Sequence, residues 1–318
     1  MDHGEAMSTR GANKALPARR RQPTMALCLA GVWFSTGCNV GDMIDREGNL
    51  RETATYTASY EDTLLDVARR FNLGYVEMVA ANPGTDPWLP GAGTEVVLPT
   101  VHLVPAVEPE GIVINLADMR LYYFDPDGDP PVSYPIGIGR DGLGTPTGTT
   151  EIVRKKVDPT WRPTPRMREE KPELPPEVPP GPDNPLGNRA MYLGWPTYLV
   201  HGTNKPWGIG RRVSSGCIRM YPEDILELFE KVEVGTKVTV VDAPIKLGWI
   251  DGELYMEAHP TQEQSDQIEA KGNFDPILPG EVVDQVQAVA GDQLGRLDWS
   301  RIRKAAVERR GYPIRITR

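Results

Sequence analysis

The sequence predicts a mainly β protein whose central domain is a curved β-sandwich or partial barrel. Between residues 108 and 242, short β-branched or aromatic runs alternate with turns rich in Gly, Pro and Asp. A smaller stretch before them has a strand–helix–helix–strand pattern, and the region after them becomes helical. The length of 318 residues suffices for two or three domains, and 32 Gly with 31 Pro favour short strands over long helices.

The first 38 residues are typical of an export signal. A basic start, with three arginines at 19–21, leads into an apolar stretch over 25–34 that is too short to span a bilayer. Its end, residues 35–38, resembles a bacterial lipobox, in which the cysteine receives a lipid. We therefore expect lipidation at Cys38, with an ordinary cleavage site just before it or an uncleaved anchor as alternatives.

The chain beyond the signal is acidic and holds one thiol. Without residues 1–37 it has 30 basic and 42 acidic side chains, a net charge of −12, which argues against nucleic acid as a partner. No later stretch is long and apolar enough to span a membrane. Two of the three cysteines, Cys28 and Cys38, lie in the signal, so Cys217 is alone. A lone thiol in an oxidising compartment is either buried or used.

Residues 53–100 form the first predicted module, after a polar linker at 39–52. A strand over 53–57 precedes a helix capped by Asp62 or Thr63, and a second helix over 75–81 precedes a closing strand over 95–98. The buried face of the first helix follows the i, i+3, i+4, i+7 pattern: Leu64, Val67, Ala68 and Phe71.

Six strands are expected in the central domain, residues 108–242. They cover residues 111–116, 120–124, 132–138, 149–156, 198–201 and 237–241. Ten prolines between Asp158 and Pro185 interrupt this pattern, because proline supplies no sheet donor and stiffens the chain. We expect residues 158–185 to form an extended surface loop, either a plain connector or a lid over the active site.

Residues 243–318 form a predicted α-rich C-terminal subdomain. Its helix candidates are residues 261–271, 280–290 and 298–309, the last with Gly311 and Pro313 as stop signals. The sequence indicates no role for this subdomain.

The segment from His201 to Met220 contains the candidate catalytic residues. It is rich in Gly and hydroxyl residues and contains Cys217 and His201, which ends a strand. A thiol becomes a strong nucleophile as thiolate and needs a nearby base, so a loop that returns Cys217 to His201 would suit acyl transfer. The main-chain N–H groups of Gly216 and Cys217 are expected to face an oxyanion, and Arg219 to bind a substrate carboxylate.

Spacing alone leaves several interpretations open. A Cys–His hydrolase, a sortase-like transferase and a protein in which Cys217 is only a buried apolar residue all fit. Papain-like peptidases place the cysteine before the histidine, so they fit badly. Sortases share the order His, Cys, Arg, with a much longer interval between the first two.

A family resemblance narrows these alternatives. His201-Gly202-Thr203 followed by Ser214-Ser215-Gly216-Cys217-Ile218-Arg219-Met220 resembles the signature of the YkuD-type L,D-transpeptidases, in the branch with ErfK and YbiS. Further similar positions are Ile136 to Arg140, Thr145 to Gly148, Trp161, Gly181 to Gly187 and Tyr192-Leu193. Residues 53–100 resemble a LysM domain, which binds the sugar backbone of peptidoglycan; a spacer that binds nothing is the alternative.

The resemblance implies a reaction and a set of residue roles. Cys217 would attack a tetrapeptide stem of peptidoglycan, His201 would act as general acid and base, and the main-chain carbonyl of Ser215 would orient His201. Ser214, Gly202, Thr203 and Arg219 would contact the substrate, with no metal and no cofactor. D-Ala would leave, and the acceptor would be a stem amine, giving a 3–3 cross-link, or a lipoprotein lysine.

The same resemblance sets the alternatives, and the N-terminal signal sets the expected location. Water as acceptor would make the enzyme a carboxypeptidase or amidase, and a non-catalytic wall-binding protein is the third hypothesis. We expect a periplasmic protein held at the outer membrane by an N-terminal lipid, and slow acylation of Cys217 by carbapenems.

Overall fold

The computed structural model describes residues 43–44, 53–277 and 280–318, all within one compact unit that spans Cys38–Arg318. The predicted signal over 1–38, the lipidation site Cys38 and most of the predicted linker over 39–52 lie outside these residues. No helix in the described part of the chain has the length and apolar character needed to cross a membrane.

The first module has the predicted strand–helix–helix–strand order. It consists of β2 (Ala54–Thr57), α1 (Leu64–Arg70), α2 (Tyr75–Ala81) and β3 (Glu95–Leu98), with β2 and β3 paired antiparallel. Thr63 caps α1 by accepting from the Asp66 N–H, and Leu64, Val67 and Ala68 are buried as their spacing predicts.

This module packs directly against the central domain. Every residue of α2 is buried, and its first two main-chain N–H groups, from Tyr75 and Val76, donate to the carbonyls of Ile209 and Gly210. Gly210 has φ +70°, and a Cβ there would lie 2.2 Å from the Gly74 Cα. The apolar core is therefore continuous from the module into the central domain.

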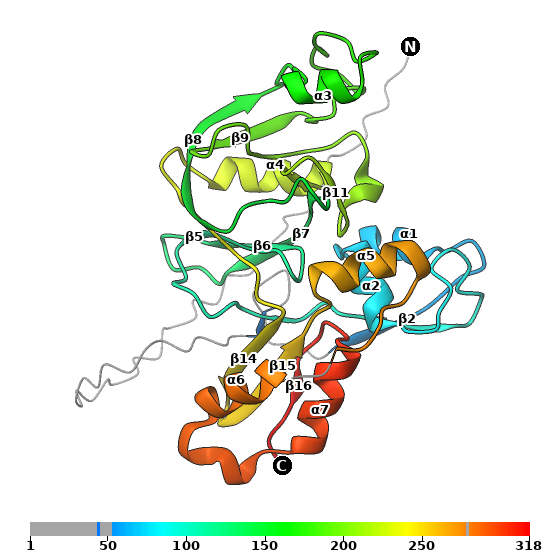
Figure 1. The fold of residues 1–318 in the computed structure, drawn as a ribbon, viewed down its shortest axis with the longest axis vertical. Helices are drawn as coiled ribbons and strands as arrows, with labels where there is room; N and C mark the ends of the chain where they lie inside the picture. Colours follow the sequence, from blue (N-terminus) through cyan, green and yellow to red (C-terminus); the bar gives the residue numbers. More distant parts are fainter. Residues whose placement is uncertain (1–42, 45–52, 278–279) are drawn as a thin grey trace, which may run out of the picture. The chain divides into compact units, whose positions relative to one another are not determined.

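The central domain has the predicted barrel-like β architecture (Figure 1), and its sheet goes further than a partial barrel because it closes on itself. Its strand order is β11-β7-β12-β10-β9-β8-β13-β5-β6, and β6 pairs again with β7. The long strand β7 allows this closure because it pairs with β6 near its start and with β12 and β11 near its end.

These strands match the predicted ones and add three. Their bounds are β5 (Gly111–Asn115), β6 (Arg120–Phe124), β7 (Val132–Gly139), β8 (Gly148–Val157), β9 (Arg189–Leu193), β10 (Leu199–His201), β11 (Arg212–Ser214), β12 (Ile218–Met220) and β13 (Lys237–Val241). A short 3-10 helix, η1 (Pro206–Gly208), lies between β10 and β11. Helix α4 (Pro222–Lys231) follows β12 and buries Ile225, Leu228 and Phe229.

The proline-rich segment is more ordered than an extended loop. It contains α3 (Pro165–Glu170), capped by the Thr164 hydroxyl, and a bridge between Trp161 and Val178. Proline is compatible with a helix at its first position, where its missing N–H would have no partner. The prediction of a fully extended loop is wrong on this point.

The C-terminal subdomain combines the predicted helices with a sheet. The helices are α5 (Gln262–Lys271), α6 (Gly280–Ala290) and α7 (Trp299–Glu308), with η2 (Gly291–Arg296) between the last two. The sheet, which was not predicted, consists of β14 (Ile245–Ile250), β15 (Glu253–Ala258) and β16 (Ile314–Arg315). A separate two-stranded pairing joins β1 (Met43–Ile44) to β4 (His102–Leu103).

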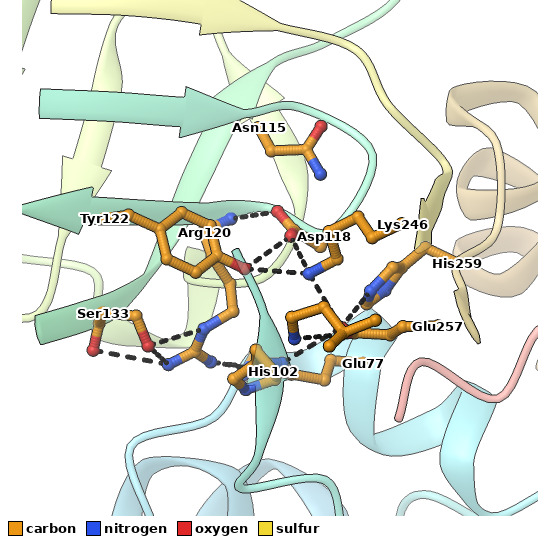
Figure 2. Close-up of polar contacts among 12 residues, drawn as sticks. Glu77, His102, Asn115, Asp118, Arg120, Tyr122, Ser133, Lys246, Glu257 and His259 are labelled. Carbon is orange, nitrogen blue, oxygen red and sulfur yellow. Dashed lines mark hydrogen bonds and ion pairs between the residues drawn. The ribbon is translucent and has the colours of Figure 1, made fainter. Parts of the chain in front are cut away.

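A buried charged cluster joins the three parts of this unit (Figure 2). Lys246 Nζ of β14 lies 2.8 Å from both Asp118 Oδ2 and Glu257 Oε1. Arg120 of β6 lies 3.2 Å from Glu77 Oε2 of α2. Burial disfavours charged carboxylates, yet Lys246 and His259 hold the pKa of Glu257 well below its usual range. The cluster therefore fixes the outer parts to the central domain through paired, buried charges.

Candidate active site

Strand register brings the predicted nucleophile and base to one face. Strands β10 and β12 are parallel neighbours, with His201 opposite Arg219. Side chains alternate along a strand, so residues two positions apart share a face. Cys217, two residues before Arg219, therefore lies on the face of His201. Both side chains line a cavity of about 620 Å³.

Cys217 is a free, partly exposed thiol, and its surroundings act on its pKa in opposite directions. Its Sγ donates a 3.4 Å hydrogen bond to the Thr197 carbonyl, which requires the protonated thiol. Burial raises the pKa of Cys217, while the Leu199 main-chain N–H and the charge of Arg219 lower it. The balance is a raised pKa, so the resting group is a thiol.

His201 is buried and neutral. Its Nδ1 lies 2.6 Å from the Gly202 carbonyl, which can only accept, so Nδ1 carries the proton and Nε2 keeps a lone pair. Burial, and then the charge of Arg219, lower the pKa of His201 to about 4. The Ser215 carbonyl was expected to orient His201, but the structure pairs the ring with the Gly202 carbonyl, and no hydrogen bond among the described residues joins His201 to Ser215.

Two hydroxyl groups fix the main chain beside the nucleophile. Ser214 Oγ donates to the Cys217 carbonyl at 2.5 Å and accepts from the Gly216 N–H at 3.1 Å. Thr145 Oγ1 donates to the Gly216 carbonyl at 2.8 Å and accepts from the Gly139 N–H at 3.1 Å. The Gly216 N–H, which was expected to face the oxyanion, is thus bonded to Ser214 in this structure.

Arg219 faces the cavity without an ionic partner. Burial lowers the pKa of its guanidinium, and the nearby Cys217 opposes that shift. Its Nε is buried and makes no hydrogen bond, and no carboxylate in the described part of the chain forms an ion pair with it. A partly buried cation without a counter-charge favours an anionic ligand, so the substrate-binding role expected of Arg219 stays a prediction.

Two of the expected substrate contacts lie elsewhere. Thr203 is buried, accepts from the Lys205 N–H at 3.0 Å, and lines a different hollow beside Asn184 and Pro222. Gly202 does not line the Cys217 cavity, and its carbonyl lies against His201 Nδ1. Ser214 and Ser215 do line that cavity.

Comparisons with known proteins all point to one family. The YkuD family, described as the L,D-transpeptidase catalytic domain, matches residues 109–240. "Probable L,D-transpeptidase YbiS" of Escherichia coli K12 is 40% identical over 277 residues, which are 85% of this chain and 85% of the relative. This chain belongs to the L,D-transpeptidase family. "Probable L,D-transpeptidase ErfK/SrfK" of the same strain is 40% identical over 303 residues, covering 92% of this chain and 96% of the relative.

A solved structure shows a partial similarity. The catalytic domain of an E. faecium L,D-transpeptidase is 27% identical, covers 42% of this chain and 98% of that chain, and superposes with a TM-score of 0.33.

The site of this L,D-transpeptidase includes residues to which sequence reasoning gave no role. The Thr197 carbonyl and the Leu199 N–H reach the sulfur because the β9–β10 turn folds over it. Thr145 belongs to a motif that the resemblance included, but its bond to Gly216 depends on the fold. Arg162 and Arg166, from the proline-rich segment, line the cavity.

A second group of ligand-type side chains lies outside the catalytic cavity. Asp118, Glu257 and His259 place ligand atoms within 4.8 Å of one another. The ammonium of Lys246 already balances the two carboxylates at 2.8 Å. This donor set is thus filled by a lysine and does not support a metal site.

Proposed function

We propose that this L,D-transpeptidase is cysteine-dependent and acts on the stem peptides of peptidoglycan. The observation that carries the proposal is that a neutral His201, at the end of β10, and Cys217, directly before the parallel neighbour β12, line one cavity. A thiol next to a base with a free lone pair is the arrangement that covalent acyl transfer requires.

The proposed reaction begins from an uncharged pair. Because the pKa of His201 is lowered and that of Cys217 is raised, the resting state is a thiol and a neutral imidazole. His201 Nε2 takes the thiol proton as Sγ attacks the carbonyl that joins the diamino acid to D-Ala. The protonated imidazole then gives that proton to the leaving amine of D-Ala, and a thioester remains on Cys217.

The second half transfers the acyl group to an amine. His201 takes a proton from the acceptor, the amine attacks the thioester carbonyl, and the thiol is restored as the new amide forms. We propose the Cys217 main-chain N–H as an oxyanion donor, since the Gly216 N–H is already bonded to Ser214. Residues 160–167 line the cavity in part, which supports a lid role for the proline-rich segment.

Incubating the purified enzyme with a disaccharide-tetrapeptide and analysing the products by mass tests this function. Cross-linked dimer with loss of D-Ala is the expected result. Tripeptide alone would identify a hydrolase, and unchanged substrate would leave only a binding protein. Cys217→Ala should lose all turnover, and turnover at the wild-type rate would refute the nucleophile assignment. We also propose that a carbapenem acylates Cys217, seen as an adduct mass that Cys217→Ala lacks.

The envelope location and the lipid anchor are proposals that rest on residues 1–38. Labelled fatty acid should be incorporated in cells and lost in Cys38→Ala, with release of the protein from the membrane fraction. A lipoprotein lysine as acyl acceptor is tested by offering a lysine-terminated peptide with the tetrapeptide donor and searching for the mixed product.

We propose that the first module binds the glycan of the wall, in the manner of a LysM domain. Two aromatic side chains support this, because Tyr60 and Trp88 are 74% and 56% exposed on the loops that flank α1 and α2. Exposed rings provide flat faces against which sugars stack. Tyr60→Ala with Trp88→Ala should weaken sedimentation with insoluble peptidoglycan, whereas Leu294→Ala, exposed in the C-terminal subdomain, should not.

A further inference from the structure

The wall of the catalytic cavity is cationic, although the chain carries a net charge of −9. Three guanidinium groups line it, those of Arg162, Arg166 and Arg219, and no Asp or Glu of the described residues does. A cavity lined by charges of one sign focuses the electric field and attracts ligands of the opposite sign. This lining therefore favours a substrate with several negative charges.

Arg162 and Arg166 differ from Arg219 in their exposure and pairing. Arg162 pairs with Glu177 at 2.8 Å, where the two side chains are 67% and 51% exposed. Arg166 pairs with Glu170 at 2.7 Å, with 40% and 42% exposed. Ion pairs this exposed contribute little stability, so a substrate carboxylate can replace the glutamate at small cost.

The main chain that carries both arginines is held in place. Asn184 Nδ2 donates to the carbonyls of Pro159, Val178 and Pro179, and Thr164 caps α3. The guanidinium groups are therefore presented from a fixed segment at the cavity wall, while their side chains remain free to change partner. Such a pair can distinguish a carboxylate from a neutral amide, because only the carboxylate accepts paired, charge-assisted hydrogen bonds.

We infer that Arg162 and Arg166 bind the free carboxylates of the donor stem. The enzyme should therefore prefer stems with free carboxylates over amidated ones. This inference rests on the proposed function. A stem peptide carries carboxylates at its glutamate, at its diamino acid and at the terminal D-Ala, and the first two can be converted to carboxamides without altering the bond that is broken.

The test compares two tetrapeptide donors, one with free carboxylates and one amidated at the glutamate and the diamino acid. For the wild-type enzyme, the free donor should have a kcat/KM about tenfold higher, mainly through a lower KM. In Arg162→Gln with Arg166→Gln this preference for the free donor should fall to about twofold or less.

Arg168→Gln is the matched control. Arg168 lies on α3 beside the same segment, is exposed, and donates to the Pro176 carbonyl, but it does not line the cavity. It should keep the wild-type preference. Equal rates of the wild-type enzyme on both donors, or a preference retained in the double variant, would overturn the inference and leave the transpeptidase intact. No product from either donor would overturn the proposed function and the inference with it.

Discussion

The hydroxyl of Thr145 donates a 2.8 Å hydrogen bond to the carbonyl of Gly216, the residue before Cys217. The same hydroxyl accepts from the Gly139 N–H at the end of β7, so it joins the nucleophile loop to the barrel. Loss of this bond would let the thiol drift from the position that the reaction requires, and small misplacements cost much in rate.

Thr145→Val removes the bond while keeping the shape of the side chain. We expect kcat to fall roughly tenfold with KM little changed, since the substrate contacts remain. Thr145→Ser should restore most of the rate because it restores the hydroxyl, and Thr147→Val, on the exposed part of the same loop, should behave as wild type. A rise in KM at constant kcat would contradict a positioning role.

The acid limit of activity should lie well below the ordinary titration range of histidine. The base must be neutral to accept the thiol proton, and burial together with the charge of Arg219 lowers the pKa of His201 to about 4. As pH falls, kcat/KM should therefore stay level through 6.5 and decline only near 4. A decline centred at 6.5 would show that His201 is not the base in this neutral state.

Arg219→Gln separates the two causes of that low pKa. Without the guanidinium charge, only burial opposes protonation, so the His201 pKa and the acid limit should both move upward. The NMR titration of the His201 ring measures this directly, even where turnover is slow. An unchanged titration would mean that burial accounts for the whole shift.

Local sequence patterns were sufficient to predict the elements of the first module and most of the barrel strands. The spacing of Leu64, Val67 and Ala68 and the cap at Thr63 define α1 without reference to distant residues. The sequence predicted a curved sandwich or partial barrel and not the closure of the sheet, because pairings such as β13 with β5 join residues more than 100 positions apart. No local pattern encodes such a pairing.

The missed sheet of the C-terminal subdomain has a specific cause. In β14 the buried positions include Lys246 and Gly248, so the buried face of the strand carries a charge and a glycine where an apolar alternation would be expected. Lys246 can be buried because two carboxylates meet it: Glu257, its cross-strand partner in β15, and Asp118, which comes from the distant central domain. Among the site residues, the sequence identified Cys217, His201 and Arg219 as candidates. The hydrogen bonds made by Ser214, Gly202 and Thr145 depend on the folded loop and could not be predicted.

Docking of the first module depends on Gly210. Its φ of +70° and the 2.2 Å approach of a built Cβ to the Gly74 Cα leave no room for a side chain. Gly210→Ala should destabilise the protein by about 3 kcal/mol in thermal or urea unfolding, from backbone strain and steric overlap together. Gly272→Ala, with φ +72° and open space around it, should lose only the strain, about 1 kcal/mol. Equal losses of stability in the two variants would mean that the contact between Gly210 and Gly74 can shift to admit a methyl group without further cost.

Lys246 should be critical for stability because it balances two carboxylates that are fully buried. In Lys246→Met, Asp118 and Glu257 stay without their cation, and unfolding free energy should fall by about 3–5 kcal/mol. Lys237→Met removes a lysine that pairs with exposed Glu108 and Glu110, and should leave the unfolding free energy almost unchanged. Adding Glu257→Gln to Lys246→Met removes one unpaired charge and should recover part of the loss, whereas a pure packing defect at Lys246 would give no recovery.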